Sequence, residues 1–288
     1  MHFLFLSIGA YLVQNLSNKS FSRKFGSNLS ILQNTMCVLF SALILWICGL
    51  GNTIHGVPLL LSALYGILYF ATIYFLQMAM GLGSLGMATI LCNMGNMIGV
   101  VFGILFFGDT FTVFTVIGII LMILVVILSA PIAKDENARG HTWFIFGLLS
   151  AAGNGTLGCI KLYVTREFHE ISSGTFLVWA FTFAGAVGLL LVLIEAKRGM
   201  NLRPYMQKPV PILGFGAGAG FGTAFGNLFF MQALASGVSS AILFPVNTGV
   251  LSFLLFLMSL LIFKEEKFTL RRSLALLFCI GGIILIRL

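Results

Sequence analysis

Long apolar stretches separated by short polar interruptions run through this chain from end to end. Several reach the roughly 20 residues that an α-helix needs to cross a hydrocarbon core. Each must be helical, because an unpaired backbone group in lipid costs several kcal/mol. The pattern predicts ten membrane-spanning helices at residues 2–17, 29–50, 57–80, 85–107, 113–132, 142–163, 175–194, 210–235, 239–263 and 273–286.

The longest polar interruption near the middle of the chain is AKDENARGH, residues 133–141, and it leaves five predicted spans on each side. Because each half has an odd number of spans, the second half must enter the membrane from the opposite side. We therefore expect residues 1–132 and 142–288 to form two five-helix repeats of inverted topology, joined by the loop 133–141. Transporters often use this arrangement, with a substrate site near the midplane between the halves.

Two segments, 75–109 and 231–265, support an internal repeat. Each contains a small-residue turn, then a long apolar span, then an acidic residue, and fixed self-similarity of this kind marks repeat architectures. Aligned without a gap, the segments pair Ala79 with Ala235, Gly81 with Gly237, Ser84 with Ser240, Leu105 with Leu261, Phe107 with Phe263, and Asp109 with Glu265. A second ungapped alignment pairs Lys19 with Lys161 and Lys24 with Arg166.

Composition leads to the same class of protein. Of the residues, 59% are hydrophobic and 8% are charged, whereas a soluble domain carries about 25% charged residues. The net charge of +8 is no nucleic-acid signal, because the Lys and Arg residues lie in short loops between spans. They concentrate in the odd-numbered loops, and the positive-inside rule then places those loops in the cytoplasm and both termini outside. We expect a multi-pass protein of a cell membrane, of the bacterial plasma-membrane type, with the lipid bilayer as its first partner and no nucleic acid.

The motifs of the two segments resemble those of the ten-helix, EamA-like members of the drug/metabolite transporter superfamily. Small-residue turns precede the fourth and ninth spans (Gly81–Ser84 and Ala235–Ser240), an apolar residue, a variable residue and an acid close each of them, and Pro245 lies within the ninth. Lys residues end the first and sixth spans. The resemblance covers nearly the whole chain and implies a cavity lined by spans one, three, four, six, eight and nine. The family's usual Trp in span one and Arg in span two are missing here, and its termini are usually cytoplasmic.

Polar side chains inside spans are expensive and point to function. In this chain they are mostly amides, several of them on the spans that the resemblance assigns to the cavity, and helical spacing puts Asn93 with Asn96 and Tyr65 with Tyr69 on common faces. They either hydrogen-bond a polar solute or hold helices together. The candidate substrate-binding residues are Gln14, Asn15, Tyr65, Tyr69, Asn93, Asn96, Asn154, Lys161, Asn227 and Asn247.

The charged groups indicate which class of solute the predicted transporter carries. No Asp or Glu lies deep in a predicted span, and exchange of cationic drugs for protons would need such a carboxylate. Lys19 and Lys161 either attract a substrate carboxylate or phosphate or, as we favour here, extend their ammonium groups to the lipid headgroups. The sequence thus predicts a gradient-driven transporter of a small polar metabolite, such as an amino acid, sugar or organic acid, working by alternating access with a coupling ion or proton. The alternative is an exporter of lipophilic drugs.

Enzyme chemistry is not predicted. Gly81-Leu82-Gly83-Ser84-Leu85-Gly86 matches GxGxxG, but the dinucleotide fingerprint requires a preceding strand, and here the motif joins two helices of lipid-spanning length. No nucleophile, base and acid occur together, and the five cysteines have neither CxxC spacing nor nearby His residues. We expect no catalytic residue, no metal site and no cofactor.

Overall fold

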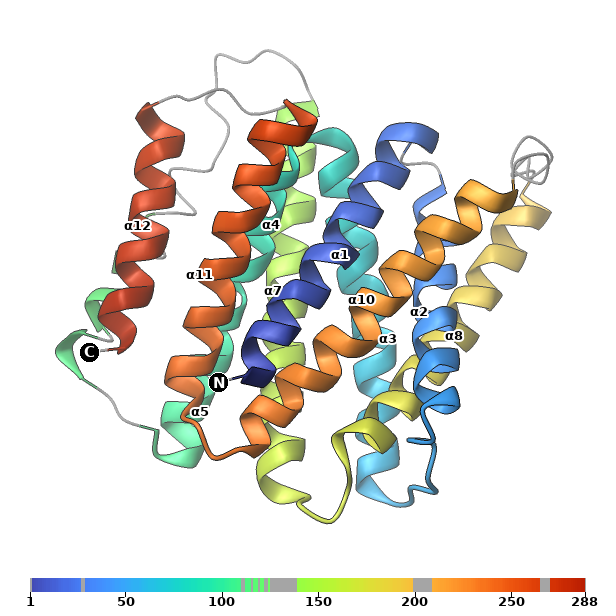
Figure 1. Cartoon of the computed structure of the whole chain (residues 1–288), viewed down its shortest axis with the longest axis horizontal. Coiled ribbons are helices and arrows are strands. Elements are labelled where there is room, and N and C mark those ends of the chain that lie inside the picture. The colour runs from blue at the N-terminus through green and yellow to red at the C-terminus, as the bar shows by residue number, and fades with distance from the viewer. Residues whose placement is uncertain are drawn as a thin grey trace.

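The structure is a computed structural model and describes residues 2–26, 29–109, 139–198, 209–264 and 270–287, with isolated positions between 112 and 124. All regular structure among these residues is helical, and the helices stand roughly side by side in one bundle (Figure 1). They are α1 (His2–Phe25), α2 (Ser30–Ile47), α3 (Val57–Leu82), α4 (Leu85–Met94), α5 (Asn96–Phe107), α7 (Arg139–Glu167), α8 (Ser173–Lys197), α10 (Pro209–Ala235), α11 (Ser240–Met258) followed by the π-helical turn η2 (Ser259–Phe263), and α12 (Leu270–Arg287).

Seven helical segments in the described part of the chain are long and apolar enough to cross a membrane. They are Ser30–Ile47, Val57–Leu82, Leu85–Phe107, His141–Glu167, Ser173–Lys197, Pro209–Ala235 and Ser240–Phe263. The protein is therefore an all-α, multi-pass membrane protein, and these seven agree with predicted spans. Helices α1 and α12 occupy the first and tenth predicted spans without belonging to the seven. Of the fifth predicted span, 113–132, the structure describes only scattered positions up to residue 124, and the loop 133–138 lies outside the described residues.

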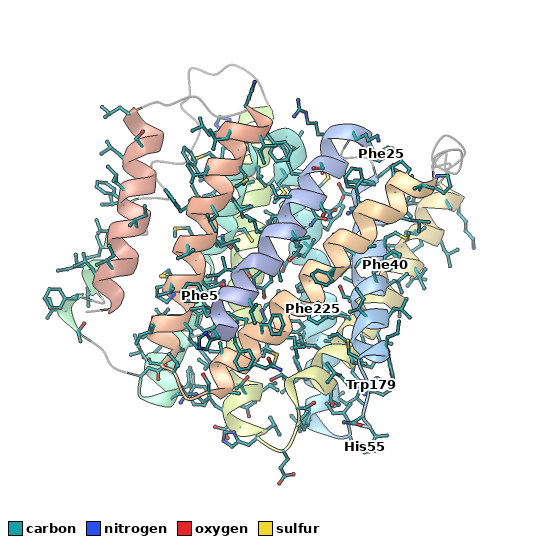
Figure 2. The ribbon with its side chains drawn as sticks, viewed as in Figure 1. Phe5, Phe25, Phe40, His55, Trp179 and Phe225 are labelled. Atoms are coloured by element: carbon teal, nitrogen blue, oxygen red, sulfur yellow. The ribbon has the colours of Figure 1, made fainter. Side chains whose placement is uncertain are left out.

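Large apolar side chains cover the outside of the bundle. Phe5, Ile47, Leu60 and Leu105 are 62%, 76%, 70% and 72% exposed, and Figure 2 labels Phe5 near the start of α1. Many amides and hydroxyls are buried instead, including Gln33 and Asn34, which are fully covered. Apolar groups outside and polar groups inside are expected of a protein whose solvent is lipid.

Glycines let α10 pack against two neighbouring helices at once. A Cβ at Gly218, Gly222 or Gly226 would meet α1, and a Cβ at Gly216 or Gly220 would meet α2. With 3.6 residues per turn, glycines two apart face different directions and glycines four apart face the same one. The glycines of α10 therefore form two small-residue ridges, one against α1 and one against α2. Backbones approach closely along such ridges, which is how helices associate without a hydrophobic driving force.

The fourth predicted span is interrupted at Gly95, which separates α4 from α5. A Cβ at Gly95 would run into the backbone carbonyl of Ala151, and a Cβ at Gly155 would approach the Gly95 carbonyl, 2.6 Å away. The break therefore coincides with the closest approach of this span to α7. By contrast, α11 continues as a helix past Pro245, so the proline does not end the helix.

Lys19 does not extend its ammonium group to the lipid headgroups. The favoured prediction for this lysine is therefore wrong. Because α1 continues to Phe25, Lys19 lies well inside the helix and is 4% exposed. Its Nζ donates to the carbonyl oxygens of Met80 at 2.8 Å and Gly83 at 3.1 Å. These carbonyls belong to the end of α3, where backbone acceptors have no helical partners. The lysine ties α1 to the last turn of α3.

Candidate functional site

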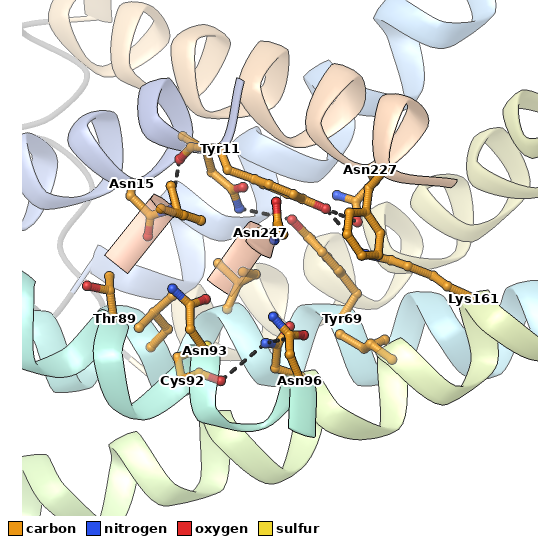
Figure 3. A pocket seen from close by; sticks show the side chains of 17 residues that line it. Tyr11, Asn15, Tyr69, Thr89, Cys92, Asn93, Asn96, Lys161, Asn227 and Asn247 are labelled. Atoms are coloured by element: carbon orange, nitrogen blue, oxygen red, sulfur yellow. Dashed lines mark hydrogen bonds between the residues drawn. The ribbon is translucent and has the colours of Figure 1, made fainter. Parts of the chain in front are cut away.

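A partly enclosed cavity lies at the centre of the bundle, between α1, α3, α4, α5, α7, α10 and α11 (Figure 3). Its cavity volume is about 60 Å³, and one water needs roughly 10–15 Å³ of such volume. The cavity therefore has room for a few waters in this conformation. The side chains around it are Tyr11, Gln14, Asn15, Tyr69, Ile73, Leu76, Thr89, Cys92, Asn93, Asn96, Asn154, Leu157, Lys161, Asn227, Phe230, Asn247 and Leu251.

The structure brings nearly all of the predicted site residues to this one cavity. Those that line it are Gln14, Asn15, Tyr69, Asn93, Asn96, Asn154, Lys161, Asn227 and Asn247. Tyr65 is the exception: it is fully buried and is not part of the lining. It lies one turn from Tyr69 on α3, with the two rings stacked 5.9 Å apart.

One hydrogen-bond network joins α1, α3 and α10 on one wall of the cavity. The Asn227 Oδ1 atom accepts from the Tyr11 hydroxyl at 3.0 Å and from the Tyr65 hydroxyl at 2.9 Å. Gln14 Nε2 donates to the Tyr69 hydroxyl at 2.9 Å. Asn227 also donates through Nδ2 to the Thr223 carbonyl oxygen at 2.8 Å. Asn227 is therefore the centre of this wall, with three hydrogen bonds on a fully buried side chain.

A second network joins α4, α5, α7 and α11 on the opposite wall. Asn93 Nδ2 donates to Ser252 Oγ at 3.0 Å, and Asn96 Nδ2 donates to Thr248 Oγ1 at 2.9 Å. Asn154 Nδ2 donates to Asn96 Oδ1 at 3.1 Å. Figure 3 shows Asn93 and Asn96 facing Tyr11 and Asn15 across the cavity. Both networks consist of neutral groups on different helices, so they can exchange partners when the helices move.

Asn247 has an unused acceptor at the cavity. It lies on α11, is 5% exposed and lines the cavity, and its Oδ1 atom has no hydrogen-bond donor. A buried polar atom without a partner costs about 1–3 kcal/mol. The side-chain Oδ1 atom of Asn247 is thus available to a water molecule or to a solute that carries a hydrogen-bond donor.

Lys161 reaches the cavity from α7 and is 8% exposed. Its Nζ donates to the Tyr11 hydroxyl at 3.3 Å and lies 5.2–5.9 Å from the ring centroids of Phe230, Tyr11 and Tyr65. Helix α7 continues to Glu167, nearly two turns beyond this lysine. The favoured interpretation of a lysine extended into the headgroups is therefore wrong for Lys161 too, because its ammonium is enclosed by aromatic rings.

Three polar lining residues were not predicted: Tyr11, Thr89 and Cys92. Helical spacing carries a signal for each. Tyr11 precedes Asn15 by four positions, and Thr89 precedes Asn93 by four, so each shares a face with a predicted residue. Cys92 precedes Asn96 by four positions, and Ser150 Oγ contacts its Sγ at 3.1 Å.

Other buried amides hold helices together away from the cavity. Gln33 Nε2 and Gln77 Nε2 both donate to Asn18 Oδ1 at 3.2 Å, which links α1, α2 and α3. Asn34 Nδ2 donates to the Phe70 carbonyl oxygen at 2.7 Å. For these residues the structural interpretation, interhelical hydrogen bonding, accounts for the polar side chain.

An ion pair joins three helix ends at one end of the bundle. The Asp109 carboxylate accepts a hydrogen bond from Ser240 Oγ, in the first turn of α11, and lies 3.6 Å from an Arg166 guanidinium nitrogen at the end of α7. The Asp109 side chain is 8% exposed. Gly108, in the left-handed conformation at φ 67°, ends α5 and leads into Asp109. An acid in this position also favours the positive end of the α11 helix dipole. Glu265, which the sequence alignment pairs with Asp109, lies outside the described residues.

Among the described residues, no group of three or more His, Cys, Asp or Glu side chains could hold a metal ion. The cavity lining combines amides, phenols, one hydroxyl, one thiol and one ammonium with five apolar side chains. Such a surface can hydrogen-bond a polar solute and enclose its carbon skeleton.

The fold is similar to that of a solved structure. The sequence matches no protein-family model and no curated protein. It is similar in structure to a protein described only as "Crystal structure of protein", with a TM-score of 0.63 and 15% sequence identity over 98% of this chain and 94% of that chain. The whole helical arrangement therefore occurs in a crystal structure, and at this identity the likeness shows the fold alone.

Proposed function

We propose that the protein is a secondary transporter that moves a small polar metabolite, such as an amino acid, sugar or organic acid, across a cell membrane by alternating access. One observation carries the proposal: a partly enclosed, amide-rich cavity lies at the centre of a membrane bundle, where helices from both halves of the chain meet. Polar residues inside a membrane are costly and mark solute pathways. Transport of a solute through such a cavity requires no catalytic group.

The two halves are proposed to be inverted five-helix repeats within a ten-span fold. Helix contacts support this, because they come in pairs that the repeat would interchange. If α1 corresponds to α7 and α3 to α10, the α1–α10 contact corresponds to the α3–α7 contact. In the same way, α2–α10 corresponds to α3–α8 when α2 matches α8, and α1–α11 corresponds to the contacts of α7 with α4 and α5.

The matched helix ends also support the repeat. Gly108 and Lys264 occupy equivalent positions in the two aligned segments, and both end their helices in the left-handed conformation, at φ 67° and 53°. Lys264 is the one non-glycine residue with positive φ among the described residues. A lysine in this conformation is uncommon, so its match with Gly108 is better explained by a shared backbone design than by the side chain.

Alternating access requires that the cavity open to one side at a time. In this conformation it has room for a few waters only, so a metabolite enters after the walls separate. The contact of Asp109 with Ser240 and Arg166 joins α5, α7 and α11 at one end of the bundle, and separation of these helices at that end would break it. We propose that this cluster closes one face of the transporter, with an ion or proton gradient supplying the energy.

The resemblance to EamA-like members of the drug/metabolite transporter superfamily gives independent support, and a bacterial plasma membrane is the proposed location. Export of lipophilic drugs is the second candidate function. It is favoured by the apolar part of the lining, which includes Ile73, Leu76, Leu157, Phe230 and Leu251. That function predicts resistance to several unrelated lipophilic compounds on overexpression and survival of transport when the lining amides are removed.

Replacing Asn247 with alanine should weaken solute binding at least tenfold, because the unused Oδ1 acceptor is removed. A thermal-shift screen of the purified protein against amino acids, sugars, nucleosides and organic acids identifies the ligand; a ligand at 100 times its Kd stabilises by about 2.7 kcal/mol. Asn247→Ala should lose about 1.4 kcal/mol of that stabilisation. Asn52→Ala, at an exposed position after α2, is the control and should keep the full shift. An unchanged shift in Asn247→Ala would remove this residue from the site.

A further inference from the structure

Lys161 brings a positive charge to the cavity without a negative one beside it. It is the one charged side chain among the described residues of the lining, which contains no Asp or Glu. The ion pairs found in the described part of the chain, Asp109 with Arg166 and Glu195 with Arg198, do not include it. A buried ammonium is costly unless an anion and hydrogen bonds compensate it.

The neighbours of Lys161 compensate it only in part. An ammonium has three N–H donors and no acceptor, and one hydrogen bond, to the Tyr11 hydroxyl, is formed. The rings of Tyr11, Tyr65 and Phe230 surround Nζ and attract it through cation–π contacts. These rings are neutral, so they leave the charge unbalanced, and the remaining donors are available to a bound group.

We propose that Lys161 binds the carboxylate of the solute, so that the transporter selects small monocarboxylates, zwitterionic ones included. The inference rests on the function proposed above and specifies its substrate class. A single ammonium matches one unit of negative charge, and no second cation of the described residues lines the cavity. Lys19, the other buried lysine of the repeat pair, donates to carbonyls at the end of α3 and does not line the cavity. A dianionic phosphate monoester would leave one charge uncompensated.

The rest of the lining fits the remainder of such a solute. The Asn247 Oδ1 atom has no donor and can accept from a hydroxyl or ammonium group of the solute. Leu157 and Phe230 lie in the same lining and can enclose a short carbon chain. A solute whose only charge is positive would instead meet the Lys161 ammonium, so cationic drugs are excluded.

The test uses matched probes that differ in one group. Binding of lactate, lactamide, alanine, alaninamide, glycerol phosphate and chloride is measured by calorimetry on purified protein in lipid nanodiscs. Lactate or alanine should bind at least tenfold more tightly than the corresponding amide, more tightly than glycerol phosphate, and more tightly than chloride. In Lys161→Met, which keeps the length of the side chain and removes its charge, carboxylate affinity should fall at least tenfold, while the affinity for lactamide, the neutral amide, stays within about threefold. Lys161→Arg should keep the preference for the carboxylate.

Lys197→Met is the control, because it removes the same charge from an exposed position at the end of α8; its affinities should equal those of the unmodified protein. The proposal is overturned if amides bind as tightly as carboxylates, if Lys161→Met retains the preference, if chloride or glycerol phosphate binds more tightly, or if no probe binds. Any of these results leaves the transport function standing when another solute is moved by the protein. Failure of the whole metabolite panel in a transport assay removes both.

Discussion

Replacing Gly222 with alanine should lower the thermal stability of the purified protein, although alanine is the better helix former. A Cβ at this position would collide with two backbone atoms of α1, the carbonyl oxygen of Ala10 and the backbone nitrogen of Gln14. Backbone atoms, unlike side chains, cannot rotate away. The helices must separate, which costs about 1–3 kcal/mol or more when a well-packed interface is overfilled. Thermal unfolding in detergent, followed by circular dichroism, measures the change.

Gly214→Ala is the matched control on the same helix. A Cβ there has no atom within 4 Å, and the general preference of helices for alanine predicts a neutral or slightly stabilising effect of up to about 1 kcal/mol. Equal stabilities of Gly222→Ala and Gly214→Ala would show that α1 and α10 do not pack through this ridge. Because Gly222 lies beside Gln14, we also expect the cavity wall of α1 to shift in Gly222→Ala.

Asn227→Leu should have the largest effect on the cavity and should lose both stability and transport. The substitution keeps the side-chain size and leaves the hydroxyls of Tyr11 and Tyr65 without an acceptor. Each unpaired buried hydroxyl costs about 1–3 kcal/mol, so the loss for the two should be about 2–6 kcal/mol. Chemical unfolding measures the stability, and uptake into liposomes measures transport.

A triple variant separates the structural from the functional effect of Asn227. When Tyr11→Phe and Tyr65→Phe are added to Asn227→Leu, no orphaned hydroxyl remains, and replacing both partners of a hydrogen bond by apolar groups is close to neutral. Tyr11→Phe also removes the one hydrogen bond of the Lys161 ammonium, so the triple variant should regain part of the stability and still fail to transport. Recovery of transport with stability would contradict the assignment of this wall to solute binding.

The sequence predicted the membrane character well because lipid solvation acts on every residue of a span. Apolar runs of spanning length must form helices, and seven of the predicted spans appear as such in the described residues. The end of the first span was misplaced for a physical reason. Lys19, Arg23 and Lys24 look like the polar end of a helix, yet α1 continues through them to Phe25, and Lys19 is satisfied by carbonyls of α3.

Most of the candidate site also followed from the sequence, because an amide inside a membrane span is costly and indicates either solute binding or interhelical hydrogen bonding. The sequence does not show the contacts that distinguish these two roles. Asn96 and Gln33 are both buried amides, and only the packing distinguishes the cavity lining from a link between α1 and α2. Lys161 was misjudged because its partners, Tyr11, Tyr65 and Phe230, come from three other helices and are distant in sequence.

Counterflow into liposomes tests the central claim most directly. Purified protein is reconstituted into liposomes loaded with one unlabelled amino acid, sugar or organic acid, and uptake of the same labelled solute is followed. The account predicts saturable uptake of at least one solute, abolished in Asn227→Leu and retained in Asn52→Ala. Absence of uptake for the whole panel under every ion gradient applied, with protein that is folded and inserted, would contradict it.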